Sequence, residues 1–280
     1  MPGGVNDSEF NFIMNNSLSR PLIVASHRRS GTHMTIDFLR RQFPETRVRK
    51  LPMKAMDRLY LNLDALVNEF HPRSVTGREA RNILSRASLP IVKTHQDYIE
   101  FRDCLKCDRL DAVIDSNTPV IYVVRDFRNL VCSLQAYQKG FDESAFVPLG
   151  EYVLQTDSRG RTRIDQWRDH VESWMKCEHA LFIRYEDVLM KPEQELSRIE
   201  DYLKIKAQMH QPYIAPPWRN VWACRIFGRL LPSPRASTIM GRSGGVVPFK
   251  WKDSLSVNCR ELVYSQLGGL LEQLGYKKEV

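Results

Sequence analysis

Residues 21–33 read PLIVASHRRSGTH, and this stretch carries the strongest indication of the fold. Its run LIVAS, residues 22–26, is apolar and rich in β-branched side chains. Such a run is typical of a strand buried on both faces, as in a parallel sheet. A short loop containing Gly31 follows, and residues 33–43 then carry apolar side chains at helical spacing. The stretch therefore predicts a strand, a glycine-bearing loop and a helix, which together form one βα unit.

The same pattern returns along the chain. Further strands are expected at residues 90–95, 120–125 and 180–185, and further helices at residues 130–139, 166–177 and 192–203. Apolar strands that alternate with helices indicate a parallel α/β sheet covered by helices on both faces. A chain of 280 residues fits one large α/β domain or two small ones. We expect a polar N-terminal arm, residues 1–20, and a single domain over residues 21–280.

Two stretches, residues 140–163 and 208–248, do not follow this alternation. The first mixes Gly, Pro, Asp and Ser, and the second is rich in proline and arginine. Long irregular insertions in a compact domain are often lids or binding loops. We therefore expect both stretches to be irregular lid or acceptor segments, with residues 49–86 as a further acceptor loop.

The composition is that of a globular protein. It is 42% hydrophobic and 26% charged, which excludes a disordered or fibrous chain. No apolar run approaches the ~20 residues of a membrane helix, and the polar start lacks a signal pattern, so we expect a cytoplasmic protein. Six cysteines are too few for a disulfide framework. Cys104 and Cys107 have the spacing of a metal-binding pair, but no second pair follows at finger distance, so no metal site is expected.

The net charge of +8 favours an anionic partner. Nucleic acid, membrane lipid and a highly charged small molecule all fit such a surplus. The basic residues are scattered, with no polybasic tail and no aromatic-interleaved RNA motif. Charge alone leaves these partners open.

The loop at residues 27–33 has the features of an anion cradle. A glycine and small hydroxyl residues between a buried strand and a helix start can turn backbone N–H groups inward, where the helix dipole adds positive potential. Arg28 and Arg29 supply cations beside it. The Gly-x-x-x-x-Gly-Lys-Ser/Thr motif is absent, which counts against an ATP-hydrolysing P-loop. The alternative is a plain βα turn with surface arginines.

Two further groups of polar residues lie where strands are expected to end. Lys93 and His95 share a face of the second strand, and a histidine at that edge can act as a general base near neutral pH. The alternative is a structural histidine hydrogen-bonded under a loop. Arg125 ends the third strand, and Ser133 lies one or two turns into the next helix. Both could reach one phosphate, the arginine through its planar fork and the serine through its hydroxyl.

Four segments, in this order, resemble the PAPS-dependent sulfotransferase family, particularly its soluble cytosolic type; PAPS is the sulfonate donor 3′-phosphoadenosine 5′-phosphosulfate. The family motifs are Pro-Lys-Ser-Gly-Thr-Thr-Trp, Lys-Thr-His, an arginine with a serine eight residues later, and Tyr-Glu-Asp. Their counterparts here are residues 28–34, residues 93–95, Arg125 with Ser133, and residues 185–187. The Trp-x-x-His-Val-x-x-Trp pattern of residues 167–174 resembles a helix of the same family, and residues 242–244 and 251–252 more weakly resemble its C-terminal motif.

The resemblance implies a P-loop-like central parallel sheet flanked by helices on both faces, with PAPS as co-substrate and PAP as product. The first loop would bind the 5′-phosphosulfate. An arginine and a serine would bind the 3′-phosphate, and a tyrosine would contact the adenine. The C-terminal motif would close over the 3′-phosphate. These cofactor-binding residues would be Arg28, Arg29, Ser30, Gly31, Thr32 and His33, then Arg125 with Ser133, then Tyr185, then Arg242, Ser243 and Gly244.

The resemblance also implies three catalytic residues. His95 would remove the proton of the acceptor, and Lys93 would stabilise the moving sulfuryl group. Arg29 stands where the soluble family has a lysine at the bridging oxygen. Two other departures are His33 and Met34, which replace Thr and Trp of the first motif. The C-terminal motif, residues 242–252, is about two residues longer than the family pattern.

We therefore predict an enzyme that moves a sulfonate group from PAPS to a hydroxyl or nitrogen of a small-molecule acceptor, such as a secondary metabolite. The transfer is in line, uses a histidine base and needs no metal. We expect no nucleic-acid or membrane partner and a monomer or homodimer. The alternatives are a P-loop-type nucleotide or metabolite kinase and a non-catalytic nucleotide- or RNA-binding module.

Overall fold

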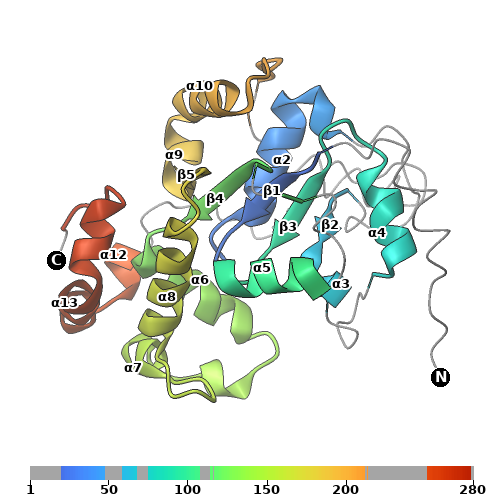
Figure 1. Ribbon diagram of the computed structural model, residues 1–280. Coiled ribbons are helices and arrows are strands. Elements are labelled where there is room, and N and C mark those ends of the chain that lie inside the picture. The colour runs from blue at the N-terminus through green and yellow to red at the C-terminus, as the bar shows by residue number, and fades with distance from the viewer. Residues whose placement is uncertain are drawn as a thin grey trace, which may run out of the picture.

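A parallel sheet of five strands forms the centre of the molecule, in the order β2-β3-β1-β4-β5 (Figure 1). The computed structural model describes residues 20–47, 59–67, 75–107, 114–115, 117–211, 213 and 251–278. The strands are β1 Leu22–Ala25, β2 Leu61–Asn62, β3 Ile91–Thr94, β4 Val120–Val124 and β5 Ala180–Arg184. All four neighbouring pairs are parallel. The predicted strands are thus all present, and β2 is an addition.

Each face of the sheet packs against its own group of helices, between which the strands lie (Figure 1). Ile23 and Ala25 of β1 belong to one apolar core, while Leu22 and Val24 belong to the other. The second core contains residues of α2 Thr32–Gln42, α9 Tyr185–Met190 and α10 Pro192–Leu203. The first contains residues of α3 Leu63–Val67, α4 Gly77–Leu84, α5 Tyr98–Cys107, α6 Phe127–Gln138, α7 Leu149–Leu154, α8 Arg163–Met175, α12 Trp251–Ser254 and α13 Val257–Gln273. The expected α/β fold class is therefore confirmed.

The strand order brings three carboxyl ends together. β1 lies between β3 and β4, so the residues that follow these three strands meet at one edge of the sheet. They are the first loop, the segment after Thr94 and the segment that begins with Arg125. Ligands of open α/β sheets bind at this kind of edge, where connections leave the central strands in opposite directions.

The expectation of an irregular segment at residues 140–163 is wrong in part. This stretch contains the 3-10 turn η4 Glu143–Ala145, all of α7, and a β-bridge between Thr156 and Thr162. Helix α7 forms because Tyr152 and Val153 are fully buried in the core, a tertiary contact that outweighs the Gly and Pro content. Similarly, β2, α3 and α4 occupy parts of residues 49–86, where we expected a loop.

Two helices begin three residues earlier than expected because polar side chains cap them. Asp126 accepts a hydrogen bond from the Arg128 N–H and starts α6 at Phe127. Thr162 and Asp165 form a capping box that starts α8 at Arg163. Helix α10 has the bounds that the sequence predicts.

Most of the second expected lid segment, residues 208–248, lies outside the described residues, as does the N-terminal arm up to residue 19. Another short 3-10 turn, η1 Pro44–Thr46, follows α2. Among the helices of the described ranges, none is both long and apolar enough to cross a membrane.

Candidate functional site

The first loop rests on the ring of Tyr185. Gly31 caps α2 with a φ of 96°, in the left-handed region that favours glycine. A Cβ atom at this position would lie 2.1 Å from the Cδ2 atom of Tyr185, which is 4% exposed at the end of β5. Both the backbone conformation and the close approach therefore require glycine, and they hold the loop against the neighbouring strand ends.

We expect Gly31→Ala to lower the free energy of unfolding by about 1–3 kcal/mol, because it adds backbone strain and a clash with Tyr185. Urea denaturation measures this loss. Gly160→Ala is the matched control, since Gly160 also has a positive φ, of 74°, but has open space where the Cβ would stand. An equal loss for the two variants would show that the contact with Tyr185 does not constrain the loop.

The start of α2 offers polar groups to this loop. The helix has no side-chain cap and no acidic residue in its first turn, so its first N–H groups keep their positive potential. The Ser30 hydroxyl is buried and has no hydrogen-bond partner among the described residues. The Thr32 hydroxyl pairs with that of Ser26. An uncapped helix start beside an unpaired buried hydroxyl has the chemistry of an anion-binding loop.

Two arginines and a serine converge on the loop from different elements. The Nε of Arg29 donates to the Ser133 hydroxyl at 3.3 Å, and Nη1 of Arg125 donates to the Arg29 carbonyl oxygen at 3.0 Å. Each guanidinium stacks on a ring, that of Arg29 over Tyr137 at 4.7 Å and that of Arg125 over Tyr185 at 4.5 Å. These contacts join the first loop to the start of α9 and to α6.

The electrostatics of this group favour an anion. Burial, and then the positive charge of Arg125, lower the pKa of Arg29 from its ordinary value. The Nε of Arg125 is buried and lacks a hydrogen-bond partner within the described part of the chain. Negative charge bound beside these guanidinium groups would offset their repulsion, and an anion at Arg125 would satisfy this donor.

His95 lies next to this loop in a geometry suited to a base. Its Nδ1 donates to the Ser26 carbonyl oxygen at 2.8 Å, which leaves the lone pair on Nε2. Burial, and then the charge of Lys93, hold the pKa of His95 well below its ordinary value. The imidazole is therefore neutral at physiological pH and can accept a proton at Nε2.

Lys93 and the main chain of His95 share one carboxylate. Asp64 accepts a hydrogen bond from the His95 N–H at 3.1 Å and forms an ion pair with Lys93 at 3.7 Å. Nζ of Lys93 also donates to the Asn62 side-chain oxygen at 3.3 Å. Sequence reasoning missed both Asn62 and Asp64, because the strand that leads to them has only two residues and no apolar run to mark it.

Helix α8 supports the segment after β3. His170, at the centre of the Trp-x-x-His-Val-x-x-Trp pattern, donates from Nε2 to the His95 carbonyl oxygen at 3.1 Å and accepts at Nδ1 from the Tyr122 hydroxyl at 2.8 Å. Burial lowers the pKa of His170 to about 4, which fits this neutral tautomer. Nε1 of Trp174 donates to the Gln96 carbonyl oxygen at 3.0 Å. The helix therefore holds two consecutive backbone carbonyls, those of His95 and Gln96.

The structure thus brings most of the predicted site residues to one sheet edge. Linked there by direct contacts, or through Ser26 and Asp64, are Arg29, Gly31, Thr32, Lys93, His95, Arg125, Ser133 and Tyr185. Arg28 is exposed, and its carbonyl oxygen accepts from the His27 ring. His33 forms a hydrogen bond with Tyr60 at 3.1 Å. Three predicted residues, Arg242, Ser243 and Gly244, lie outside the described residues.

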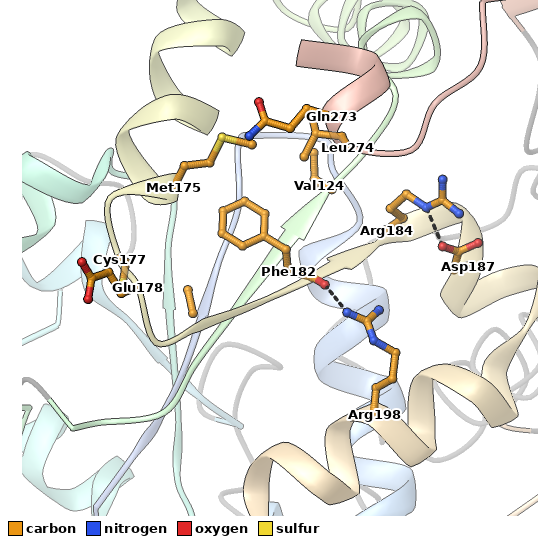
Figure 2. A pocket seen from close by; sticks show the side chains of 11 residues that line it. Val124, Met175, Cys177, Glu178, Phe182, Arg184, Asp187, Arg198, Gln273 and Leu274 are labelled. Atoms are coloured by element: carbon orange, nitrogen blue, oxygen red, sulfur yellow. Dashed lines mark hydrogen bonds and ion pairs between the residues drawn. The ribbon is translucent and has the colours of Figure 1, made fainter. Parts of the chain in front are cut away.

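A pocket of about 570 Å³ lies at the outer strand β5, and none of the predicted site residues lines it (Figure 2). Its two arginines are already engaged. Arg184 pairs with Asp187, and Arg198 donates to the Phe182 carbonyl oxygen at 3.0 Å. The convergent polar groups at the carboxyl ends of β1, β3 and β4 are therefore the better candidate site. Within the described ranges, no group of three His, Cys, Asp or Glu side chains gathers in a way that could hold a metal ion.

Comparisons with known proteins match this chain to one family. A family model described as a sulfotransferase domain matches residues 19–215. Mouse sulfotransferase 2B1 is 29% identical over 127 residues, which cover 44% of this chain and 35% of that protein. Rat sulfotransferase 1A1 is 24% identical over 98 residues, which cover 33% of each chain. The matched regions thus span about a third of these curated relatives.

Solved structures with the same fold include two sulfotransferases. The crystal structure of mouse sulfotransferase SULT7A1 complexed with PAP has a TM-score of 0.52 at 16% identity, and the match covers 92% of this chain and 89% of that one. Sulfotransferase STF9 from Mycobacterium avium has a TM-score of 0.50 at 14% identity, with coverages of 97% and 81%. At these identities the likeness concerns the fold.

Proposed function

Because the chain belongs to the sulfotransferase domain family, we propose that it transfers a sulfonate group from PAPS to a hydroxyl or nitrogen of a small-molecule acceptor. The observation that carries this proposal is the convergence of Arg29, Arg125 and Ser133 on the first loop. A donor with phosphates at both its 5′ and 3′ positions needs cations and hydroxyl donors at two points, and this cluster offers them. The mouse structure with the same fold is a PAP complex, which agrees with such a donor.

The buried polar atoms of the site fit PAPS. The unpaired Ser30 hydroxyl and the unpaired Nε of Arg125 are hydrogen-bond donors that a phosphate or sulfate oxygen would satisfy. The N-terminus of α2 adds positive potential on the same side of the sheet. In this assignment the first loop binds the 5′-phosphosulfate, Arg125 and Ser133 bind the 3′-phosphate, and Tyr185 contacts the adenine.

When bound, PAPS supplies the sulfuryl group and a leaving group that departs as PAP. The protein's own residues then have three tasks. His95 takes the acceptor proton at Nε2, which faces away from its bond to Ser26. Lys93 and Arg29 stabilise the negative charge that grows on the transferred group and on the bridging oxygen. This division of roles matches in-line transfer, in which positioning and charge stabilisation do most of the work.

The rival functions differ in the nucleotide they prefer. A P-loop kinase would bind ATP, and a nucleotide- or RNA-binding module would respond to RNA. A thermal-shift comparison of PAP, ATP and a short RNA separates them, because at equal free concentration the ligand that binds more tightly raises the melting temperature more. We expect PAP to give the largest shift. Labelled PAPS, incubated with the protein and a metabolite extract, then identifies the acceptor.

The remaining predictions stand as proposals. The protein acts in the cytoplasm on a small molecule such as a secondary metabolite, without a metal, a nucleic-acid partner or a membrane partner, and as a monomer or homodimer. Size-exclusion chromatography with light scattering measures the last of these. Parts of the acceptor site are proposed to lie in residues 140–163 and 208–248.

We expect Ser133→Ala and Arg125→Ala to weaken PAP binding while leaving AMP binding nearly unchanged, because only PAP carries the 3′-phosphate. Losing one charge-assisted contact costs on the order of 1.5–3 kcal/mol. Calorimetry with both nucleotides measures the difference. Arg102→Ala is the control for Arg125. Arg102 also stacks on a tyrosine ring, that of Tyr98, but it lies outside the proposed site. Equal losses for PAP and AMP would contradict the assignment of the 3′-phosphate site.

A further inference from the structure

One carboxylate contacts both His95, the proposed base, and Lys93, the proposed cation for the transferred group. Asp64 stands just after β2, near the start of α3, and uses its two oxygens differently. Oδ1 accepts from the His95 N–H at 3.1 Å, and Oδ2 lies 3.7 Å from Nζ of Lys93. The side chain of Asp64 is 20% exposed and that of Lys93 is 6% exposed, so the ion pair is screened less than a surface pair.

We propose that Asp64 is a positioning residue for sulfonate transfer, which fixes the Lys93 ammonium and the His95 backbone relative to one another. The inference rests on the proposed function and concerns the same site. It adds a residue that touches neither donor nor acceptor in the proposed assignment and acts through two residues that do.

The sheet register explains how Asp64 reaches this place. Leu61 and Asn62 of β2 pair with Val92 and Lys93 of β3. Asp64 lies two residues after Asn62, and His95 lies two residues after Lys93. The Asp64 carboxylate is therefore placed beside the carboxyl end of β3. The short strand and the residues after it thus place two partners beside the lysine ammonium, the Asn62 amide oxygen at 3.3 Å and the Asp64 carboxylate.

His95 is held at three points, and Asp64 supplies one of them. Ser26 accepts from the ring at 2.8 Å, and His170 donates to the backbone carbonyl at 3.1 Å. Asp64 holds the N–H. Without the Asp64 carboxylate, the His95 N–H loses its side-chain hydrogen-bond acceptor. The position of Nε2 relative to the acceptor substrate then becomes less defined. A displacement of about 1 Å can cost ~100-fold in rate.

Lys93 depends on the same carboxylate for its direction. A lysine side chain has four flexible methylenes and a compact ammonium, so its position is set by the groups that it contacts. Removal of Asp64 takes away the opposite charge and one of the groups that hold the ammonium. Both effects reduce the fraction of molecules in which the ammonium is placed for transfer.

The test compares Asp64→Ala and Asp64→Asn with Glu79→Gln. Glu79 is a suitable control because its carboxylate also accepts a backbone N–H, that of Thr76, in the capping box of α4. We expect Asp64→Ala to lower kcat by about 100-fold, with PAP affinity retained. Asp64→Asn keeps an acceptor for the His95 N–H and is expected to fall between Ala and the wild type. Glu79→Gln is expected to retain wild-type kcat.

A double-mutant cycle and an exchange measurement complete the test. In a Lys93→Ala background, Asp64→Ala is expected to lower kcat less than in the wild type, since the two residues act together. Hydrogen exchange of the His95 amide is expected to accelerate in Asp64→Ala and to stay unchanged in Glu79→Gln.

The outcomes separate this inference from the proposed function. A wild-type protein that transfers no sulfonate from PAPS to any acceptor overturns the proposed function, and the exchange rate of the His95 amide still decides whether Asp64 holds that backbone. An active wild type with unchanged kcat in folded Asp64→Ala overturns the positioning role. Parallel losses of kcat, PAP affinity and melting temperature would also overturn it, in favour of a structural role.

Discussion

Replacing His95 with asparagine is expected to lower kcat by about 10²–10⁴-fold, the usual contribution of a general base. Asparagine keeps an N–H that can donate to the Ser26 carbonyl oxygen, as Nδ1 of the histidine does, but it has no basic nitrogen. The variant therefore removes the base and preserves the local hydrogen bond. PAP is expected to bind and to raise the melting temperature as in the wild type, because the proposed donor contacts do not involve His95.

His95→Ala and the exposed His210→Ala serve as comparisons. If His95 were a structural residue under its loop, asparagine would restore most of the rate that alanine loses. If the acceptor ionised by itself, both variants at position 95 would turn over within a few-fold of the wild type. Either result would refute the role of the base.

The pH dependence of the rate follows from the pKa of His95, which burial and then the charge of Lys93 lower well below 6.5. A base works in its neutral form, so kcat is expected to stay level through pH 6.5 and to fall only at more acidic pH. His27, with its pKa lowered by desolvation to about 3, and His170, with its pKa lowered to about 4, are also neutral in the folded protein. Each of these two histidines takes up a proton more readily in the unfolded chain than in the folded protein. The stability that the neutral rings contribute is therefore present above pH 6.5 and is lost as the pH falls through their lowered pKa values. The rate profile is therefore measured together with circular dichroism.

Arg29→Ala is expected to lower kcat by about 10²–10³-fold, the range seen when one preorganised donor to a developing charge is removed. Donor affinity is expected to change less, because negative charge on the bridging oxygen is greatest in the transition state. The guanidinium is held in place by its bond to Ser133 and by its stacking on Tyr137. Steady-state kinetics at saturating PAPS measure kcat separately from affinity.

Arg102→Ala is the matched control, since its guanidinium also stacks on a tyrosine ring, that of Tyr98, and lies outside the proposed site. Arg29→Lys tests the chemistry further. A lysine supplies the charge but not the planar fork that reaches Ser133, so we expect it to recover much of the rate and not all of it. Wild-type turnover of Arg29→Ala would mean that another residue stands at the bridging oxygen and that the first loop is misassigned.

The parts of the site that the sequence predicted are those that follow apolar strands of four or five residues. Each of β1, β3 and β4 is a short run of buried residues, and the residue types after it were visible without a structure. Asp64 could not be found in this way, because β2 has two residues and exists through its pairing with β3. The role of His170 was hidden for another reason. The sequence pattern of residues 167–174 resembled only a helix of the family, and the tertiary structure reveals that the His170 ring bonds to the His95 carbonyl.

Capping accounts for most of the errors in helix bounds. Asp126 and the Thr162–Asp165 pair were present in the sequence as start signals, while the apolar periodicity that defined the expected helices begins later. The error at residues 140–163 had a different cause. Local composition there favours turns, and the helix forms because Tyr152 and Val153 reach the core.

The contact of Gly31 with Tyr185 determines when the first loop acquires its shape during synthesis and folding. The bond from Arg29 to Ser133 spans 104 residues, and Tyr185 is farther along the chain still. Contacts of such long range form slowly, because the intervening chain must first be brought together. A nascent chain that ends before residue 185 contains β1 and its loop but lacks the ring on which the loop rests. We therefore expect this loop to reach its folded shape only after β5 has joined the sheet.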